Sequence, residues 1–269
     1  MATDVDGDRF AWREAGHGDL VVLLHGLGGS RISWEPQLAA LSTHYRVAAW
    51  DLPGYGASAP LPDTGTSTAV TFAALAQAAA DWIATLGASQ AHVVGISMGA
   101  MISQYLAVWH PQCVRSLTLL STSPAFGLDG TSPDEWRAAR LAPLAAGQQP
   151  AEFADRVLRA IAGPHIDEAA LDGQRRAMAR ISGEALQRSI ECVVTHDARS
   201  LLSAITAPTL VMVGELDAET PLAYARVLSE GITHAWLQTV PAAGHLLNVE
   251  AADSVNAAIA RHLKHVEGQ

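Results

Sequence analysis

The sequence predicts an α/β fold with a mostly parallel central sheet, helices on both faces and an inserted helical cap. Continuous apolar runs, as expected for strands buried on both faces, alternate with segments of helical periodicity. Between residues 124 and 206 these runs stop, and alanine- and arginine-rich helical stretches replace them. We therefore expect a core made of residues 1–123 and 207–269, and a cap made of residues 124–206. The expected breaks between cap helices are Gly147, Pro150, Gly163-Pro164 and Gly183.

The predicted core elements follow one another in a regular order. Residues 9–14 alternate between apolar and polar side chains, which predicts an antiparallel edge strand. Buried strands are expected at residues 21–25, 47–50, 91–96 and 208–214, and further strands at residues 116–120 and 235–240. Helices are expected over residues 72–86, directly after residue 97, and near residues 253–263.

Composition limits the class of protein. With 269 residues, of which 49% are apolar, one domain with an insertion can bury a sizeable core. The net charge of −10 argues against nucleic-acid binding through a basic surface. Cys113 and Cys192 match neither a metal pattern nor a disulfide framework, so we expect no metal, no other cofactor and a cytoplasmic location. Residues 1–8 do not form a signal peptide and no apolar stretch reaches membrane-spanning length, so no membrane partner is expected.

The most informative stretch is Gly95-Ile96-Ser97-Met98-Gly99, a G-x-S-x-G pattern between a predicted strand and a predicted helix. In that context the pattern forms a nucleophile elbow, a sharp turn that exposes the serine hydroxyl. Small residues must flank the serine because the turn is tight. The N-terminus of the following helix directs free N–H groups toward developing negative charge. Ser97 is therefore the candidate nucleophile.

A serine nucleophile needs a general base, and the base needs an orienting carboxylate. Asp217 follows a predicted buried strand, at the sheet edge where active sites of open α/β sheets gather. We prefer it to its neighbours Glu215 and Glu219. His245 lies in a short loop after the next predicted strand, and histidine is the usual proton carrier near neutral pH. The order Ser97, Asp217, His245 is the chain order expected for this arrangement.

The chain has 11 histidines, so their positions matter to this assignment. His92 begins a predicted strand and is expected to be structural. His196 is interpreted as a polar cap residue in preference to a substrate contact. The remaining histidines are interpreted as surface or loop residues: His17, His44, His110, His165, His234, His262 and His265.

The segment His25-Gly26-Leu27-Gly28-Gly29 follows a predicted buried strand and predicts an oxyanion hole. A loop of this kind places one backbone N–H beside the substrate carbonyl, and the residue after the nucleophile supplies the second. The predicted donors are the amides of Leu27 and Met98. A phosphate-binding loop is a poor fit, because the chain contains no G-x-x-x-x-G-K-[ST] pattern and this segment is not G-x-G-x-x-G.

These motifs occur in the order typical of α/β-hydrolases, and the chain resembles that superfamily over nearly its whole length. Three stretches are similar to 3-oxoadipate enol-lactonases, whose patterns are S-M-G-G-M-x-x-Q, H-P-E-R-V-x-x-L and G-x-x-D-x-x-T-P. The corresponding segments are residues 97–104, 110–117 and 214–221. Ala100 and Cys113 depart from these patterns. The resemblance implies a small-molecule ester or lactone substrate, with 3-oxoadipate enol-lactone of aromatic-compound catabolism as its specific form.

The cap is expected to select the substrate. The resemblance implies a substrate with a free carboxylate, which Arg137 or Arg140 of a cap helix could bind, or Arg31 after the oxyanion segment. Trp136 on the same helix and Trp34 are candidates for the pocket wall. Solvated arginines and a core role for Trp34 remain alternatives.

The predicted reaction is acyl transfer to the serine, followed by hydrolysis of the acyl-enzyme. Alternatives that use the same three residues are a C–C bond hydrolase of a ring-cleavage product and a general carboxylesterase. A ligand receptor with slow hydrolysis is a further alternative of another class. The haloalkane route is disfavoured, because its nucleophile would be an aspartate. The oligomeric state is left open.

Overall fold

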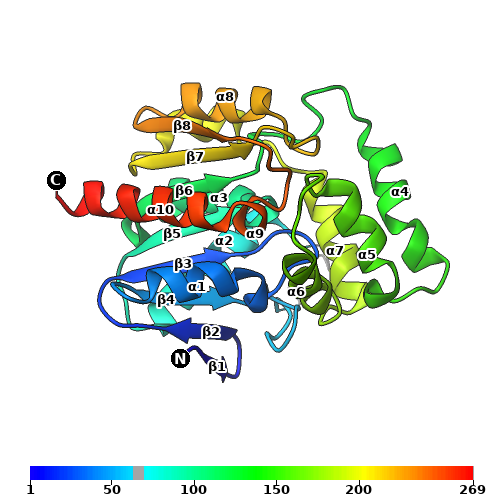
Figure 1. The fold of residues 1–269 in the computed structure, drawn as a ribbon, viewed down its shortest axis with the longest axis horizontal. Coiled ribbons are helices and arrows are strands. Elements are labelled where there is room, and N and C mark those ends of the chain that lie inside the picture. The colour runs from blue at the N-terminus through cyan, green and yellow to red at the C-terminus, as the bar shows by residue number, and fades with distance from the viewer. Residues whose placement is uncertain (63–69, 269) are drawn as a thin grey trace.

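The computed structural model describes residues 1–62 and 70–268, and it confirms the predicted α/β class (Figure 1). Within these residues, eight strands form one sheet in the order β1-β2-β4-β3-β5-β6-β7-β8. The pairs β1·β2 and β2·β4 are antiparallel, and every other pair is parallel. The strands are β1 Thr3–Asp6, β2 Ala11–Ala15, β3 Leu20–Leu24, β4 Arg46–Trp50, β5 Ala91–Ile96, β6 Val114–Leu120, β7 Thr209–Gly214 and β8 Ala235–Val240. Every strand predicted from the sequence is therefore present.

The predicted edge strand is not at the edge of the sheet. β2 covers most of residues 9–14, but β1 pairs with its outer side. β1 is mostly exposed and polar, so no hydrophobic alternation marks it in the sequence. It is held by main-chain pairing and by ion pairs from Arg13 to Asp4 at 2.8 Å and from Arg31 to Asp6 at 2.6 Å.

Helices cover both faces of the sheet, and each face has its own apolar core (Figure 1). One core receives α1 and α10, and the other receives α2, α3 and α8. The helices of the core are α1 Glu35–Leu41, α2 Phe72–Thr85, α3 Met98–Trp109, α8 Leu222–Gly231, α9 Leu247–Glu250 and α10 Ala252–Glu267. Short 3₁₀ turns are η1 Arg31–Trp34, η2 Pro111–Cys113 and η3 Arg199–Ala204.

Four further helices separate β6 from β7 along the chain and lie together to one side of the sheet (Figure 1). They are α4 Pro133–Ala145, α5 Pro150–Ile161, α6 Glu168–Met178 and α7 Gly183–Val193, and we call them the inserted helices. The predicted breaks lie at their ends: Gly147 follows α4 with φ +82°, and Pro150 opens α5, where a missing N–H loses no helix bond. Division of the chain at residues 124 and 206 stays a prediction.

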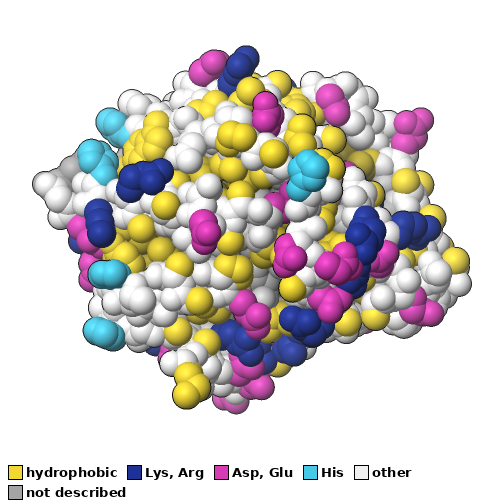
Figure 2. Space-filling model, in the orientation of Figure 1, with side chains coloured by type: hydrophobic (Ala, Val, Ile, Leu, Met, Phe, Trp, Pro, Cys, Tyr) yellow, Lys and Arg dark blue, Asp and Glu magenta, His cyan; other side chains and the backbone are white. Residues whose placement is uncertain are grey.

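Charged side chains of both signs intermingle on the face shown in Figure 2, so this face carries no basic patch of the kind that binds nucleic acid. On α5 and α6 they form a network in which Arg175 contacts Asp155 and Glu168, and Arg159 contacts the same two carboxylates. In the described part of the chain, no helix combines the length and the apolar character needed to cross a membrane.

Three buried histidines predict that the protein loses stability in mild acid. Burial lowers the pKa of His92, His196 and His262 to about 4. Each is 2% exposed or less, which corrects the surface interpretation of His262, whose Nε2 donates to the Leu117 carbonyl at 3.1 Å. As the pH is lowered from 6.5 toward 4, the unfolded chain binds protons at these residues and the folded chain does not. The free energy of unfolding therefore decreases as the pH is lowered.

We expect each of these histidines to remove about 2 kcal/mol of stability at pH 5 relative to pH 7.5. Urea unfolding at a series of pH values measures this slope. A His196→Gln variant should show a shallower slope between pH 6.5 and 5, whatever its stability at pH 7.5. Equal stability of the native chain at pH 7.5 and pH 5 would contradict the prediction.

Candidate active site

Ser97 lies at a strained turn between β5 and α3. Its φ of 52° and ψ of −121° are unusual for a residue with a side chain. Gly95 and Gly99 make the turn possible, because a Cβ at Gly99 would lie 2.0 Å from the Leu24 carbonyl oxygen and one at Gly95 would lie 2.6 Å from the Ala100 nitrogen. The turn is held from the neighbouring strand, where the Leu120 carbonyl accepts from the Ser97 amide at 3.0 Å. The turn therefore holds the Ser97 hydroxyl at the carboxyl end of β5.

The three residues predicted from the sequence form one hydrogen-bonded chain. His245 Nε2 lies 3.0 Å from Ser97 Oγ, and His245 Nδ1 lies 3.1 Å from both carboxylate oxygens of Asp217. Asp217 also accepts from the Glu219 amide at 3.0 Å and from the Thr220 amide at 2.9 Å. The Thr220 hydroxyl donates to its other carboxylate oxygen at 2.8 Å. The carboxylate is therefore fixed with one side toward the imidazole.

The electrostatics of this chain favour a basic imidazole. Burial alone would lower the pKa of His245, but the Asp217 carboxylate outweighs burial and raises it. Burial alone would raise the pKa of Asp217, but His245 and the Thr220 hydrogen bonds keep it below its ordinary value. Asp217 thus stays ionised and fixes the proton of neutral His245 on Nδ1, which leaves Nε2 free to accept from the Ser97 hydroxyl.

Glu250, which the sequence analysis did not single out, holds the loop that carries His245. One of its carboxylate oxygens accepts from the amides of Gly244 and Gly163 at 2.7 and 2.8 Å, and the other accepts from the Leu246 amide at 2.8 Å. The His245 amide itself donates to the Ile161 carbonyl at 3.0 Å. The histidine loop is therefore tied to the end of α5, so the inserted helices and the base are positioned together.

The predicted oxyanion segment forms a tight turn beside Ser97. The Gly29 amide donates to the Gly26 carbonyl at 3.0 Å. His25 anchors the turn, because its Nε2 accepts from the Leu52 amide and its Nδ1 donates to the Gly26 carbonyl. Met98 is the first residue of α3, so its N–H has no partner within the helix. Leu27, Ser97 and Met98 line one hollow of about 90 Å³.

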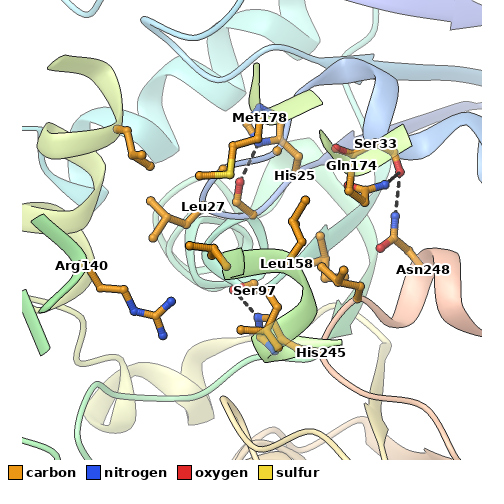
Figure 3. A pocket seen from close by; sticks show the side chains of 18 of the residues that line it. His25, Leu27, Ser33, Ser97, Arg140, Leu158, Gln174, Met178, His245 and Asn248 are labelled. Atoms are coloured by element: carbon orange, nitrogen blue, oxygen red, sulfur yellow. Dashed lines mark hydrogen bonds between the residues drawn. The ribbon is translucent and has the colours of Figure 1, made fainter. Parts of the chain in front are cut away.

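A second, mainly apolar cavity of about 110 Å³ also borders Ser97 (Figure 3). Ser97 and His245 line it together with side chains from α5, α6 and α7. Its apolar wall includes Phe153, Leu158, Met178, Leu186 and Ile190. Ser97 therefore lines both hollows, so a substrate in either of them lies beside the nucleophile.

The predicted substrate contacts are only partly brought to these hollows. Trp136 lines the hollow with Leu27 and Met98, and Arg140 lines the apolar cavity. Arg140 is already paired, since one of its nitrogens donates to both carboxylate oxygens of Glu219 at 2.7–2.8 Å and its guanidinium lies 5.0 Å from the Trp136 ring centre. Arg137 lines neither hollow; it is partly exposed and pairs with Asp134 within α4.

Two other candidates are structural. Trp34 is fully buried in the core between the sheet and the helices α1 and α10, so it does not reach the site. Arg31 is buried beside Asp6 and Asp51 and holds β1 and β4 to the oxyanion segment. His196 is also buried and makes no substrate contact: its Nε2 donates to the Ser123 carbonyl at 2.9 Å, and its Nδ1 lies 3.2 Å from the hydroxyl of Tyr105 in α3. Burial, which a single sequence does not reveal, removes Trp34 and Arg31 from the candidate substrate contacts.

Among the described residues, one group of side chains has the spacing to hold a metal ion. Ligand atoms of Asp19, His92 and Glu267 lie within 4.8 Å of one another. His92 lies at the start of β5, whereas Ser97 follows its end, so the group is at the opposite end of the sheet. It therefore contributes nothing to chemistry at Ser97.

The comparisons with known proteins agree with the fold. A family described as "alpha/beta hydrolase fold" matches residues 19–166, and one described as "TAP-like protein" matches residues 189–268. The chain belongs to the α/β-hydrolase superfamily and has its hydrolase fold.

Its relatives act on different substrates. The chain is 32% identical to the pimeloyl-[acyl-carrier protein] methyl ester esterase of Chromobacterium violaceum, covering 93% of this chain and 96% of that protein. It is 33% identical to a protein of Variovorax paradoxus provisionally named carbamate hydrolase RutD, covering 93% of each. The crystal structure of the enol-lactonase from Burkholderia xenovorans LB400 superposes with a TM-score of 0.83 at 25% identity, covering 97% of this chain and 100% of that one. These relatives support a hydrolase of esterase type and do not fix the substrate.

Proposed function

We propose that this protein hydrolyses small-molecule carboxylic esters through an acyl-enzyme on Ser97. The observation that carries the proposal is the continuous chain from Ser97 Oγ through the His245 ring to Asp217, with separations of 3.0 and 3.1 Å. His245 Nε2 takes the hydroxyl proton as Ser97 attacks the ester carbonyl, and the same proton goes to the leaving alcohol. The backbone amides of Leu27 and Met98 bind the oxyanion. Water activated by His245 then releases the acid.

The residues that line the apolar cavity favour a substrate chain without charge. In the described part of this wall Arg140 is the one residue with a permanent positive charge, and Glu219 neutralises it through two hydrogen bonds. A substrate carboxylate would have to displace Glu219 to reach Arg140. A neutral ester is therefore the preferred substrate class, and 3-oxoadipate enol-lactone ranks below it, although the enol-lactonase superposition supports lactone cleavage as the second candidate.

The inserted helices are proposed to act as the cap that selects the substrate, since α5, α6 and α7 supply most of the cavity wall. We also propose a cytoplasmic location. Its support is the state of the two cysteines: both are free, and burial raises the pKa of Cys192 to about 12, which makes that thiol inert.

The test compares methyl hexanoate, p-nitrophenyl butyrate and 3-oxoadipate enol-lactone, with labelling of the intact protein by a fluorophosphonate. We expect labelling at Ser97, turnover of both esters, and lactone turnover at least tenfold slower in kcat/KM. Fast lactone turnover would refute the preference for neutral esters and would support enol-lactone hydrolysis as the function. Labelling with no ester or lactone turnover would redirect the search to C–C bond substrates, and no labelling at all would overturn a serine mechanism.

A further inference from the structure

The apolar cavity beside Ser97 has one polar end, formed by Ser33, Gln174 and Asn248 (Figure 3). Figure 3 shows these three residues together on one side of the cavity, with Arg140 on the opposite side and Ser97 between them. They come from distant parts of the chain: η1, α6 and α9. All three are nearly buried, with exposed fractions of 4%, 7% and 3%. Polar groups in such a place need partners, because burying an unpaired one is unfavourable.

The Ser33 carbonyl determines how the two amide side chains are oriented. It accepts from Asn248 Nδ2 at 2.8 Å and, more weakly, from Gln174 Nε2 at 3.5 Å. A carbonyl accepts only from the nitrogen end of an amide, so the 2.8 Å contact directs Asn248 Nδ2 toward Ser33, and the longer contact favours the same orientation for Gln174. Asn248 is further fixed through its own backbone carbonyl, which accepts from Gln37 Nε2 at 2.8 Å.

This orientation leaves two acceptors for a ligand. Within the described part of the chain, neither Gln174 Oε1 nor Asn248 Oδ1 accepts a hydrogen bond, and both residues line the cavity. No carboxylate lines the described part of that wall, so an ammonium group would lie there without a counter-charge. A carboxylate would face both oxygens without a counter-charge, because Arg140 lies on the opposite side of the cavity and is paired with Glu219. A neutral donor, a hydroxyl or a carboxamide, satisfies both oxygens at the least expense in desolvation.

We propose that Gln174 and Asn248 form a subsite for a neutral hydrogen-bond donor at the far end of the substrate chain that fills the cavity. The inference rests on the proposed ester hydrolysis and adds to it a class of substrate: esters with a terminal hydroxyl or carboxamide. The subsite predicts lower activity toward simple alkyl esters than toward their hydroxyl counterparts, since an alkyl terminus would leave two desolvated acceptors unpaired.

The experiment compares kcat/KM for matched esters with chains of five to eight carbons. One series places the hydroxyl on the acyl side, as in methyl 6-hydroxyhexanoate against methyl hexanoate. The other places it on the alcohol side, as in 6-hydroxyhexyl acetate against hexyl acetate. At the best length in one series we expect the hydroxyl ester to be preferred about tenfold. We expect methyl 6-aminohexanoate and monomethyl adipate to be at least tenfold poorer than methyl 6-hydroxyhexanoate.

Two variants separate the subsite from general effects. Gln174→Met removes one acceptor and keeps the side-chain length. The hydroxyl preference should therefore fall to about threefold or less, partly because the hydroxyl ester loses a partner and partly because the alkyl ester no longer leaves this acceptor unpaired. Gln187→Met is the matched control, because Gln187 is an exposed residue of α7 that hydrogen-bonds to Glu191; it should leave the preference unchanged. Absence of a hydroxyl preference at every length in both series, or an unchanged preference in Gln174→Met, would overturn the subsite.

Binding of the hydroxyl and alkyl esters to the Ser97→Ala protein, measured by calorimetry, distinguishes failure of the subsite proposal from failure of the ester-hydrolysis proposal. Tighter binding of the hydroxyl ester without turnover by the native protein would support the subsite and refute ester hydrolysis. Turnover of esters by the native protein, with equal binding and equal rates for hydroxyl and alkyl chains, would support ester hydrolysis and refute the subsite.

Discussion

Ser97→Ala is expected to lower kcat for ester hydrolysis by about 10⁴–10⁶-fold. The reason is geometric: Ser97 Oγ lies 3.0 Å from His245 Nε2, and Ser97 lines both hollows. Alanine can adopt the positive φ of residue 97 as serine does, so folding should be retained. Steady-state kinetics with an activated ester, with circular dichroism to confirm the fold, measure the loss.

Ser121→Ala is a closely matched control for this substitution. Ser121 also has a positive φ, 43°, is buried, and follows the neighbouring strand β6, but it lines neither hollow. We expect this variant to keep its activity within a few-fold. If Ser97→Ala kept most of its activity, or if both variants lost it equally, the acyl-enzyme mechanism would be wrong.

Local sequence was sufficient to predict the three residues of the hydrogen-bonded chain. Each of them follows a strand of the parallel part of the sheet, directly or after a short turn, and the carboxyl ends of parallel strands meet at one edge of the sheet. Ser97, Asp217 and His245 therefore needed no knowledge of the inserted helices. The edge strand β1 could not be predicted, because it is stabilised by main-chain bonds and ion pairs and has no apolar pattern.

The pocket wall depends on tertiary packing, which periodicity does not encode. Arg137 and Arg140 are three residues apart on α4, yet one pairs within its own helix and the other reaches Glu219 at the cavity. Gln174 and Asn248 come together because both side-chain amides donate to the Ser33 carbonyl, and the three residues belong to distant segments of the chain. Trp34 shows the reverse case, because an aromatic residue near the oxyanion segment faces the core. Sequence patterns therefore predict which chemistry is present, whereas the residues of the cavity wall are brought together by packing of the inserted helices.

Asp217→Asn should lower kcat by about 10⁴-fold, because the asparagine amide favours the wrong tautomer of His245 and no longer stabilises the imidazolium. The pH profile should change as well. In the native protein the Asp217 carboxylate raises the pKa of His245, so kcat/KM should rise with pH to a midpoint above 6.5. Without the carboxylate, burial dominates and lowers that pKa, so the residual activity should reach its plateau at lower pH.

Kinetics between pH 5 and 9 test both effects, and the two neighbouring glutamates serve as controls. Glu215 accepts from the Ala242 amide and Glu219 pairs with Arg140, and neither contacts the His245 ring through a hydrogen bond. Glu215→Gln and Glu219→Gln should therefore keep kcat within about tenfold. A collapse of activity in either glutamine variant, with Asp217→Asn still active, would transfer the orienting role to that glutamate. A loss confined to Asp217→Asn, with its midpoint shifted to lower pH, would show that the carboxylate acts through the imidazole and not merely through the fold.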